Sequence, residues 1–140
     1  MDRGYPDYEG DKSGLYLKPE WAAKEGTDKD LYASQILTPG TGVSITYVVP
    51  AGKRLSITQI SVSLFAAVVA TDGELNQIVR GYVTVDGDYK IDIGGNGGAG
   101  MSLNKPAIAI AGQTVVGMVE NWSNHNTYGS IAINGYEVSN

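Results

Sequence analysis

The sequence holds few residue types that could carry out chemistry, and they are dispersed along the chain. Its 140 residues include one histidine, His125, and no cysteine, which excludes thiolate nucleophiles and cysteine-ligated metal sites. A lone histidine acting as a general base would need an acid partner and a nucleophile close by. His125 is instead surrounded in the sequence by amides and hydroxyls. We therefore expect His125 to be an exposed loop residue and the chain to be a non-enzyme without metal or cofactor.

The acidic residues give no stronger indication of catalysis. Glu120 and Glu137 fall on the last two expected strands, and a carboxylate pair could cleave glycosidic bonds, but nothing in their spacing makes them face each other. Residues 72–74 and 86–88 alternate Asp or Glu with Gly, yet neither has the spaced ligand series of a calcium loop. Asp and Gly are expected to supply turn geometry there. The sequence thus favours binding over catalysis.

One group of side chains near the C-terminus has the composition of a sugar-binding surface. An aromatic face flanked by amides suits a sugar ring, which has both apolar and hydroxyl-bearing sides. The alternative interpretation is a hairpin loop in which the tryptophan covers the end of the core. The candidate glycan-binding residues are Asn121, Trp122, Asn124, Asn126 and Tyr128.

The first thirty residues differ in composition from the rest. They hold eight of the fifteen acids and five of the ten bases. Pro19 and Gly26 frame one short expected helix. We predict an extended N-terminal docking arm over residues 1–30, whose aromatic and aliphatic side chains anchor a partner; packing along its own body is the alternative. The candidate partner-docking residues are Tyr5, Tyr8, Leu15, Tyr16, Leu17 and Trp21.

From residue 31 onward the apolar side chains recur with a period of two, which is typical of strands. Residues 31–37 are expected to form an edge strand. A change of parity near Thr58 and Gln59 predicts a bulge, and Asp86-Gly87 predicts a tight hairpin. The glycine-rich residues 94–100 are expected to form a loop.

These strands, with no helical segment between them, predict an all-β fold: an antiparallel two-sheet sandwich over residues 31–140. A jelly-roll-like arrangement fits best, because the turns at residues 50–53 and 111–113 each precede a long strand. An immunoglobulin-like topology is not excluded by periodicity. The expected buried face comprises Val43, Ile45, Tyr47, Ile57, Ile60, Val62, Val83, Val85, Ile108, Ile110, Val119, Ile131 and Ile133.

Charge limits the partners that the chain can bind. The net charge is −5 and the pI about 4.7, so the protein repels phosphate backbones and anionic lipid surfaces. We expect no nucleic-acid and no membrane partner. The N-terminus lacks the apolar run of a secretory signal, and the longest apolar stretch, residues 64–70, is too short to span a bilayer. Release by lysis, as for virus particles, is consistent with this pattern.

Three segments of the body resemble small jelly-roll structural proteins of tailed-bacteriophage virions. They are residues 49–57 (VPAGKRLSI), 112–116 (GQTVV) and 131–138 (IAINGYEV). The resemblance is to head decoration or cement proteins and related neck or tail accessory proteins. It implies a virion location and a non-enzymatic homo-oligomer, often a trimer, whose arm grips neighbouring copies or another capsid protein.

Two other functions fit the same residues. One is a carbohydrate-binding module or receptor-binding tip, which would use the glycan-binding candidates. The other is a filament subunit, in which the N-terminal segment of one copy completes the sheet of the next.

Overall fold

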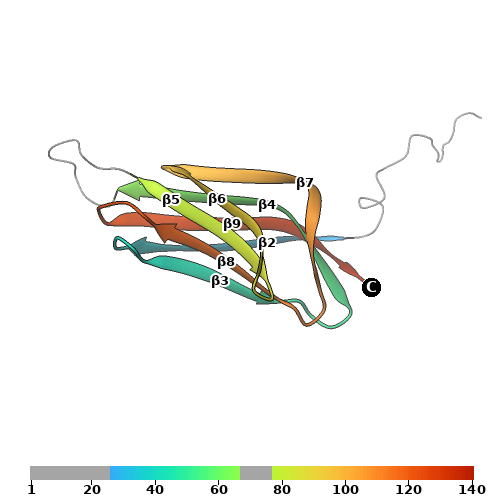
Figure 1. The fold of residues 1–140 in the computed structure, drawn as a ribbon. Coiled ribbons are helices and arrows are strands. Elements are labelled where there is room, and N and C mark those ends of the chain that lie inside the picture. The colour runs from blue at the N-terminus through green and yellow to red at the C-terminus, as the bar shows by residue number, and fades with distance from the viewer. Residues whose placement is uncertain (1–25, 67–76) are drawn as a thin grey trace, which may run out of the picture.

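The computed structural model describes residues 26–66 and 77–140, which form two antiparallel four-stranded sheets around one core (Figure 1). One sheet has the order β2-β9-β4-β7 and the other β3-β8-β5-β6. The predicted all-β antiparallel architecture is confirmed. No helix in the described ranges is long and apolar enough to cross a membrane. The strands are β2 (Thr27–Leu37), β3 (Gly42–Val48), β4 (Lys53–Ala66), β5 (Ile78–Val85), β6 (Asp88–Asn96), β7 (Gly98–Ile110), β8 (Thr114–Asn121) and β9 (Thr127–Ser139).

Strand β2 forms one edge of its sheet, as predicted for residues 31–37, and pairs with β9 along its whole length. It begins at Thr27, earlier than the expected boundary at residue 31. Residues 27–30 are polar, but an edge strand tolerates polar side chains, and Asn134 Nδ2 on β9 donates a 2.8 Å hydrogen bond to Asp30 Oδ1. The expected short helix, which ends before Gly26, lies outside the described residues.

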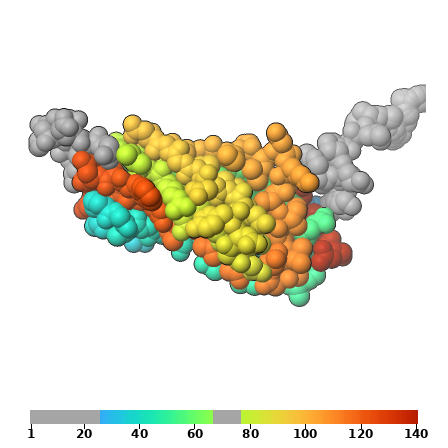
Figure 2. All heavy atoms as spheres, in the orientation of Figure 1, coloured from blue at the N-terminus to red at the C-terminus, as the bar shows by residue number. Residues whose placement is uncertain are grey.

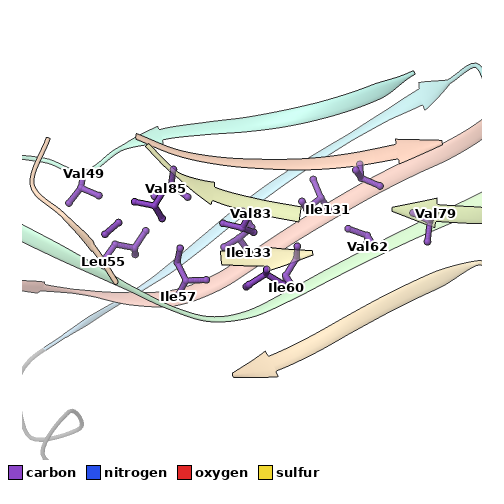
Figure 3. Packing of buried hydrophobic residues seen from close by; sticks show 14 of the residues in the cluster. Val49, Leu55, Ile57, Ile60, Val62, Val79, Val83, Val85, Ile131 and Ile133 are labelled. Carbon is purple, nitrogen blue, oxygen red and sulfur yellow. The ribbon is translucent and has the colours of Figure 1, made fainter. Parts of the chain in front are cut away.

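The core lies between the two sheets and is filled by alternate side chains of facing strands (Figure 3). The sheets approach closely where glycines face inward. A Cβ at Gly117 would lie 2.4 Å from Ile133 Cδ1, and one at Gly81 would lie 2.5 Å from Val62 Cγ1. Most of the predicted buried face is confirmed, with these residues at most 4% exposed: Ile57, Ile60, Val62, Val83, Val85, Val119, Ile131 and Ile133.

The predicted bulge in β4 is confirmed, because the register of β4 shifts between Ile57 and Gln59 against both neighbouring strands. The shift changes parity, so that Ile57 and Ile60 both face the core. Opposite the bulge, β7 makes a larger detour. Ile57 pairs with Ala107, whereas Gln59 pairs with Ser102, so residues 103–106 are left without partners on β4.

One part of the predicted core, on β7, is wrong. Ile108 and Ile110 are 43% and 55% exposed, while Ala109 between them is fully buried and pairs with Leu55. The small alanine faces the crowded interior, and the larger isoleucines point to solvent. On β3, the residues predicted to be buried, Val43, Ile45 and Tyr47, are partly buried and pack against the core.

The expected loop over residues 94–100 is also wrong. Strand β6 continues to Asn96 and β7 begins at Gly98, so Gly97 alone, with φ 83°, turns the chain from one sheet to the other. Gly94 and Gly95 pair with Arg80 and Val79 on β5. Backbone hydrogen bonds to a neighbouring strand hold this segment where side-chain packing does not.

The predicted hairpin at Asp86-Gly87 is confirmed. Both residues adopt positive φ, 49° and 87°, as a type I′ turn between β5 and β6 requires. Asp86 Oδ1 also accepts a 2.8 Å hydrogen bond from the backbone N–H of Thr114. These acidic turn residues therefore serve backbone geometry, as expected.

Candidate functional site

A dense group of polar and aromatic side chains lies on the outward side of the β3-β8-β5-β6 sheet, the side turned to the viewer in Figure 2. Antiparallel register brings the group together: Glu120 pairs with Arg80, and Tyr82 pairs with Asp92. Their sequence neighbours Val79, Val83 and Val119 point into the core. We call the group the Trp122 site and define it as Arg80, Tyr82, Tyr89, Asp92, Glu120 and Trp122.

Arg80 is the centre of the Trp122 site. Its guanidinium donates two hydrogen bonds to Asp92, from Nε to Oδ1 at 3.0 Å and from Nη2 to Oδ2 at 2.8 Å. Its Nη1 lies 3.6 Å from Glu120 Oε1. The hydrogen bonds from Arg80 hold the pKa of Asp92 below its ordinary value, and those to Asp92 raise the pKa of Arg80. The Arg80–Asp92 pair therefore stays ionised and oriented near neutral pH.

Two tyrosine rings pack around the same guanidinium. Arg80 Cζ lies 4.7 Å from the ring centroid of Tyr82 and 5.8 Å from that of Tyr89. The two rings are 5.1 Å apart and tilted by 60°, a favourable arrangement for an aromatic pair. Burial, followed by the charge of Glu120, raises the pKa of Tyr82. These contacts fix the polar groups on a rigid sheet surface.

Trp122 forms the outer wall of the site. Its side chain is 59% exposed, but its indole Nε1 donates a 2.9 Å hydrogen bond to Glu120 Oε1, and its backbone N–H donates to Ile78 O. The ring borders two depressions. One, of about 670 Å³, is lined by Arg80, Asp92 and residues 93–96; the other, of about 440 Å³, is lined by Gly40, Glu120 and Ser123.

Asn121, a glycan-binding candidate, is fully buried and holds the loop after β8. Its Nδ2 donates to Leu37 O at 3.0 Å and to His125 O at 2.9 Å. Its Oδ1 accepts hydrogen bonds from the backbone N–H and the hydroxyl of Ser123. The amide is thereby occupied inside the protein, so Asn121 positions Trp122 and is not open to a ligand.

The expectation that His125 is exposed is wrong. The side chain is 7% exposed, and its Nδ1 lies 3.0 Å from Asn124 Oδ1. Asn121, Ser123 and His125 all point inward, two residues apart, whereas Asn124 and Asn126 between and after them are exposed. The strand-like period of two therefore continues through this loop. Continuing the alternation of β8 past its end would have placed the histidine inside.

The predicted glycan-binding group is not brought together. Tyr128 lies on β9, paired with Ile36 on one side and Phe65 on the other, on the outward side of the second sheet. Trp122 follows β8 in the first sheet. The sequence placed Trp122 and Tyr128 in one cluster because they are close in the chain, but the chain passes from one sheet to the other between them.

The second sheet carries a different surface around Tyr128. Ser63 and Ser130 lie between the large side chains and share a 2.6 Å hydrogen bond. A groove of about 320 Å³ runs here, and the residues of the described chain that line it carry no charge. We call this surface the apolar face; its large side chains, 53–67% exposed, are Tyr32, Ile36, Phe65 and Tyr128.

The two candidate catalytic carboxylates are not brought together either. Glu137 accepts a 2.5 Å hydrogen bond from Tyr47 Oη, which joins β9 to β3 across the sandwich. Burial, followed by the hydrogen bond and charge of Glu137, raises the pKa of Tyr47 to about 12. Glu120 pairs with Gly42 at the other end of β3. Within the described residues, no group of three or more His, Cys, Asp or Glu residues is arranged to hold a metal ion.

Several candidates lie outside the described residues. The acidic turn at residues 72–74 is one of them. The partner-docking candidates of the arm are the others: Tyr5, Tyr8, Leu15, Tyr16, Leu17 and Trp21.

Comparison with known proteins gives no relative by sequence: no family model matches the chain, and no curated protein matches it. Among solved structures, the *Yersinia pseudotuberculosis*-derived mitogen matches at TM-score 0.41 with 11% identity over 75% of this chain and 84% of that chain. The *Aeromonas hydrophila* periplasmic inhibitor of g-type lysozyme matches at 0.34 with 14% identity over 79% and 88%. The *Drosophila* NLP core matches at 0.29 with 20% identity over 77% and 98%. At these scores the neighbours establish neither a family nor a function.

Proposed function

We propose that this chain is a non-enzymatic structural protein of a virus particle, a capsid decoration or cement protein or a related accessory protein. In this proposal it assembles with copies of itself through its N-terminal arm. The strand orders β2-β9-β4-β7 and β3-β8-β5-β6 support a jelly-roll topology, which is common among viral capsid and lectin domains. The resemblance of residues 49–57, 112–116 and 131–138 to virion proteins supports the location.

The apolar face is the observation that carries the proposal. Three neighbouring strands present large aromatic or aliphatic side chains to solvent: Ile36 on β2, Tyr128 on β9 and Phe65 on β4. A contiguous exposed apolar patch is a common mark of a protein interaction site. Aromatic side chains are also enriched near the centre of protein interfaces.

We assign the arm of a second copy as the occupant of this face. Copies of the chain each carry a net charge of −5 and therefore repel each other. The groove of the apolar face is lined by uncharged residues, so this repulsion is weakest there. The described chain begins at Gly26, beside Val138, at the end of β2 remote from the apolar face. The preceding 25 residues can extend over roughly 80 Å, enough to reach a neighbouring copy. Their aromatic side chains then supply anchors for the groove.

The test compares the oligomeric state of the full chain with two variants, by light scattering after size exclusion at micromolar concentration. One variant lacks residues 1–25, which leaves β2 intact, and the other is Phe65→Ser. We expect the full chain to be oligomeric and both variants to be folded monomers. A monomeric full chain, or an oligomer unchanged in both variants, would contradict docking of the arm on the apolar face. Open fibres in electron micrographs would indicate strand exchange instead.

The virion location needs a separate measurement. We expect peptides of this chain in virus particles purified from cells that express its gene, at many copies per particle by quantitative mass spectrometry. Particles that lack the chain would contradict the location even if the protein self-assembles.

A further inference from the structure

We propose that the Trp122 site binds a neutral sugar ring, with the indole of Trp122 as its platform. The site lies on the opposite sheet from the apolar face, and this inference does not rest on the proposed virion function. It also differs from the sequence-based sugar site, because Asn121 is buried and Tyr128 lies on the other sheet. The evidence is the combination of an exposed ring, oriented acceptors and a depression between them.

Trp122 provides the apolar contact. Its ring is more than half exposed although its N–H edge is fixed by Glu120 Oε1, so it is presented in a defined orientation. Sugar rings carry C–H groups on one side, and these pack against an aromatic face. Because the indole is already fixed, little side-chain entropy is lost when a ligand binds.

Asp92 and Glu120 provide the polar contacts. Their side chains are 47% and 25% exposed, and both are oriented by Arg80. Each carboxylate has about four acceptor positions, and the contacts described above leave acceptor capacity on both. Sugar hydroxyls can donate to these positions. Charge-assisted hydrogen bonds of this kind are stronger than those between neutral groups.

The depression beside Trp122 provides the space. Gly94 lies on the edge strand β6, directly opposite Arg80, and faces outward. It has no side chain to fill the depression. A Cβ there would lie 3.1 Å from Val79 O, so the backbone leaves little room for a larger residue. The depression of about 670 Å³ lies within the size range of small-molecule sites.

Local charge selects the ligand class. The site holds one guanidinium and two carboxylates, and Arg80 is already engaged with Asp92. The local charge is negative, as is the net charge of the chain, −5. Sialic acids, uronic acids and phosphorylated sugars are therefore repelled, and uncharged hexose units are favoured.

The first experiment applies the full chain to an array of neutral and sialylated oligosaccharides and follows with titration of the best neutral binder. Trp122→Ala should weaken binding at least tenfold, and Glu120→Gln should weaken it several-fold. Ile110→Ala is the control, because that isoleucine is 55% exposed against 59% for Trp122 but lies on the other sheet and outside the apolar face. It should leave the affinity unchanged.

A spectroscopic readout separates direct contact from indirect effects. The chain has two tryptophans, so Trp21→Phe leaves Trp122 as the only indole. Saturating neutral sugar should shift the emission of Trp122 in that variant, and thermal melting should confirm that Trp122→Ala remains folded. The inference is overturned by no saturable binding to any neutral glycan, by binding of sialylated glycans alone, or by binding that Ile110→Ala removes and Trp122→Ala does not.

Discussion

The two sheets share one core but present different chemistry to solvent around Trp122 and around Phe65. On the β3-β8-β5-β6 sheet, Arg80 is paired with Asp92 and faces Glu120, so the charged groups of that surface satisfy one another. On the β2-β9-β4-β7 sheet, the exposed side chains around Phe65 and Tyr128 are uncharged and mostly apolar. Among the described residues, Arg80, Asp92 and Glu120 of the first surface are therefore paired with one another, whereas covering the second surface would bury its apolar side chains and be favourable.

This difference shows how one fold can offer two binding modes. A fixed polar surface with an exposed ring suits a small ligand, because its hydrogen-bonding groups need no rearrangement. An apolar groove suits a protein segment, because burial of side chains supplies the affinity. Both surfaces depend on the same core to hold their strands in register, so variants of the core should affect both and variants of one surface should affect only that surface.

The largest expected effect follows from removing core volume beneath both surfaces. Ile57 is fully buried, and Ile57→Ala should lower the free energy of unfolding by about 2–5 kcal/mol. Ile110→Ala is the control: this residue is 55% exposed, so its loss should cost no more than about 0.5 kcal/mol. Urea denaturation measures both. Equal losses of unfolding free energy in the two variants would contradict the finding that Ile110 on β7 faces solvent.

The next effect concerns the loop that presents Trp122. Asn121→Ala removes a buried amide that hydrogen-bonds to Leu37, Ser123 and His125, and should lower the free energy of unfolding by about 2–3 kcal/mol. It should also weaken sugar binding, because Trp122 loses its support. Asn126→Ala, at an exposed position of the same loop, should change stability little. A stable, fully binding Asn121→Ala protein would contradict the role assigned to this amide.

A smaller effect is expected where the two sheets are joined. Tyr47 donates to Glu137 across the sandwich, and its pKa is raised from 10.0 to about 12. A pKa raised in the folded state gives stability that is fully present below pH 10 and lost as the pH rises from 10 through 12. Unfolding free energies measured across this interval should fall less steeply for Tyr47→Phe than for the unaltered chain. Identical slopes would show that Tyr47 does not contribute.

Local signals in the sequence were sufficient for much of the fold. The parity change at Thr58 and Gln59 marked the bulge, and Asp86-Gly87 marked the hairpin, because each depends on adjacent residues. Long-range pairing was not predictable in the same way. The glycines of residues 94–100 form strands because β5 and β4 pair with them. On β7, pairing with β4 turns the small Ala109 inward opposite Leu55, whereas side-chain size alone favoured Ile108 and Ile110.

The candidate site likewise combines a residue that a local pattern identified with residues that only long-range strand pairing brings together. Arg80, Asp92 and Glu120 are far apart in the sequence and meet only through the registers of β5 with β6 and β8. The sequence identified Trp122 by its type but grouped it with its chain neighbours. Tyr32 and Phe65 were not identified as surface residues. For Tyr32 a signal was present, because residues 31–37 have apolar side chains at both odd and even positions, which indicates a strand with two apolar sides.

We propose that the two outer surfaces bind different partners independently, and a paired measurement on two variants can test this. Trp122→Ala and Phe65→Ser would each be assayed for neutral-sugar affinity and for oligomeric state at the same protein concentration. We predict that Trp122→Ala loses sugar binding and keeps its oligomeric state, whereas Phe65→Ser becomes monomeric and keeps its sugar affinity. Loss of both properties in either folded variant, or of neither property in both, would contradict the claim.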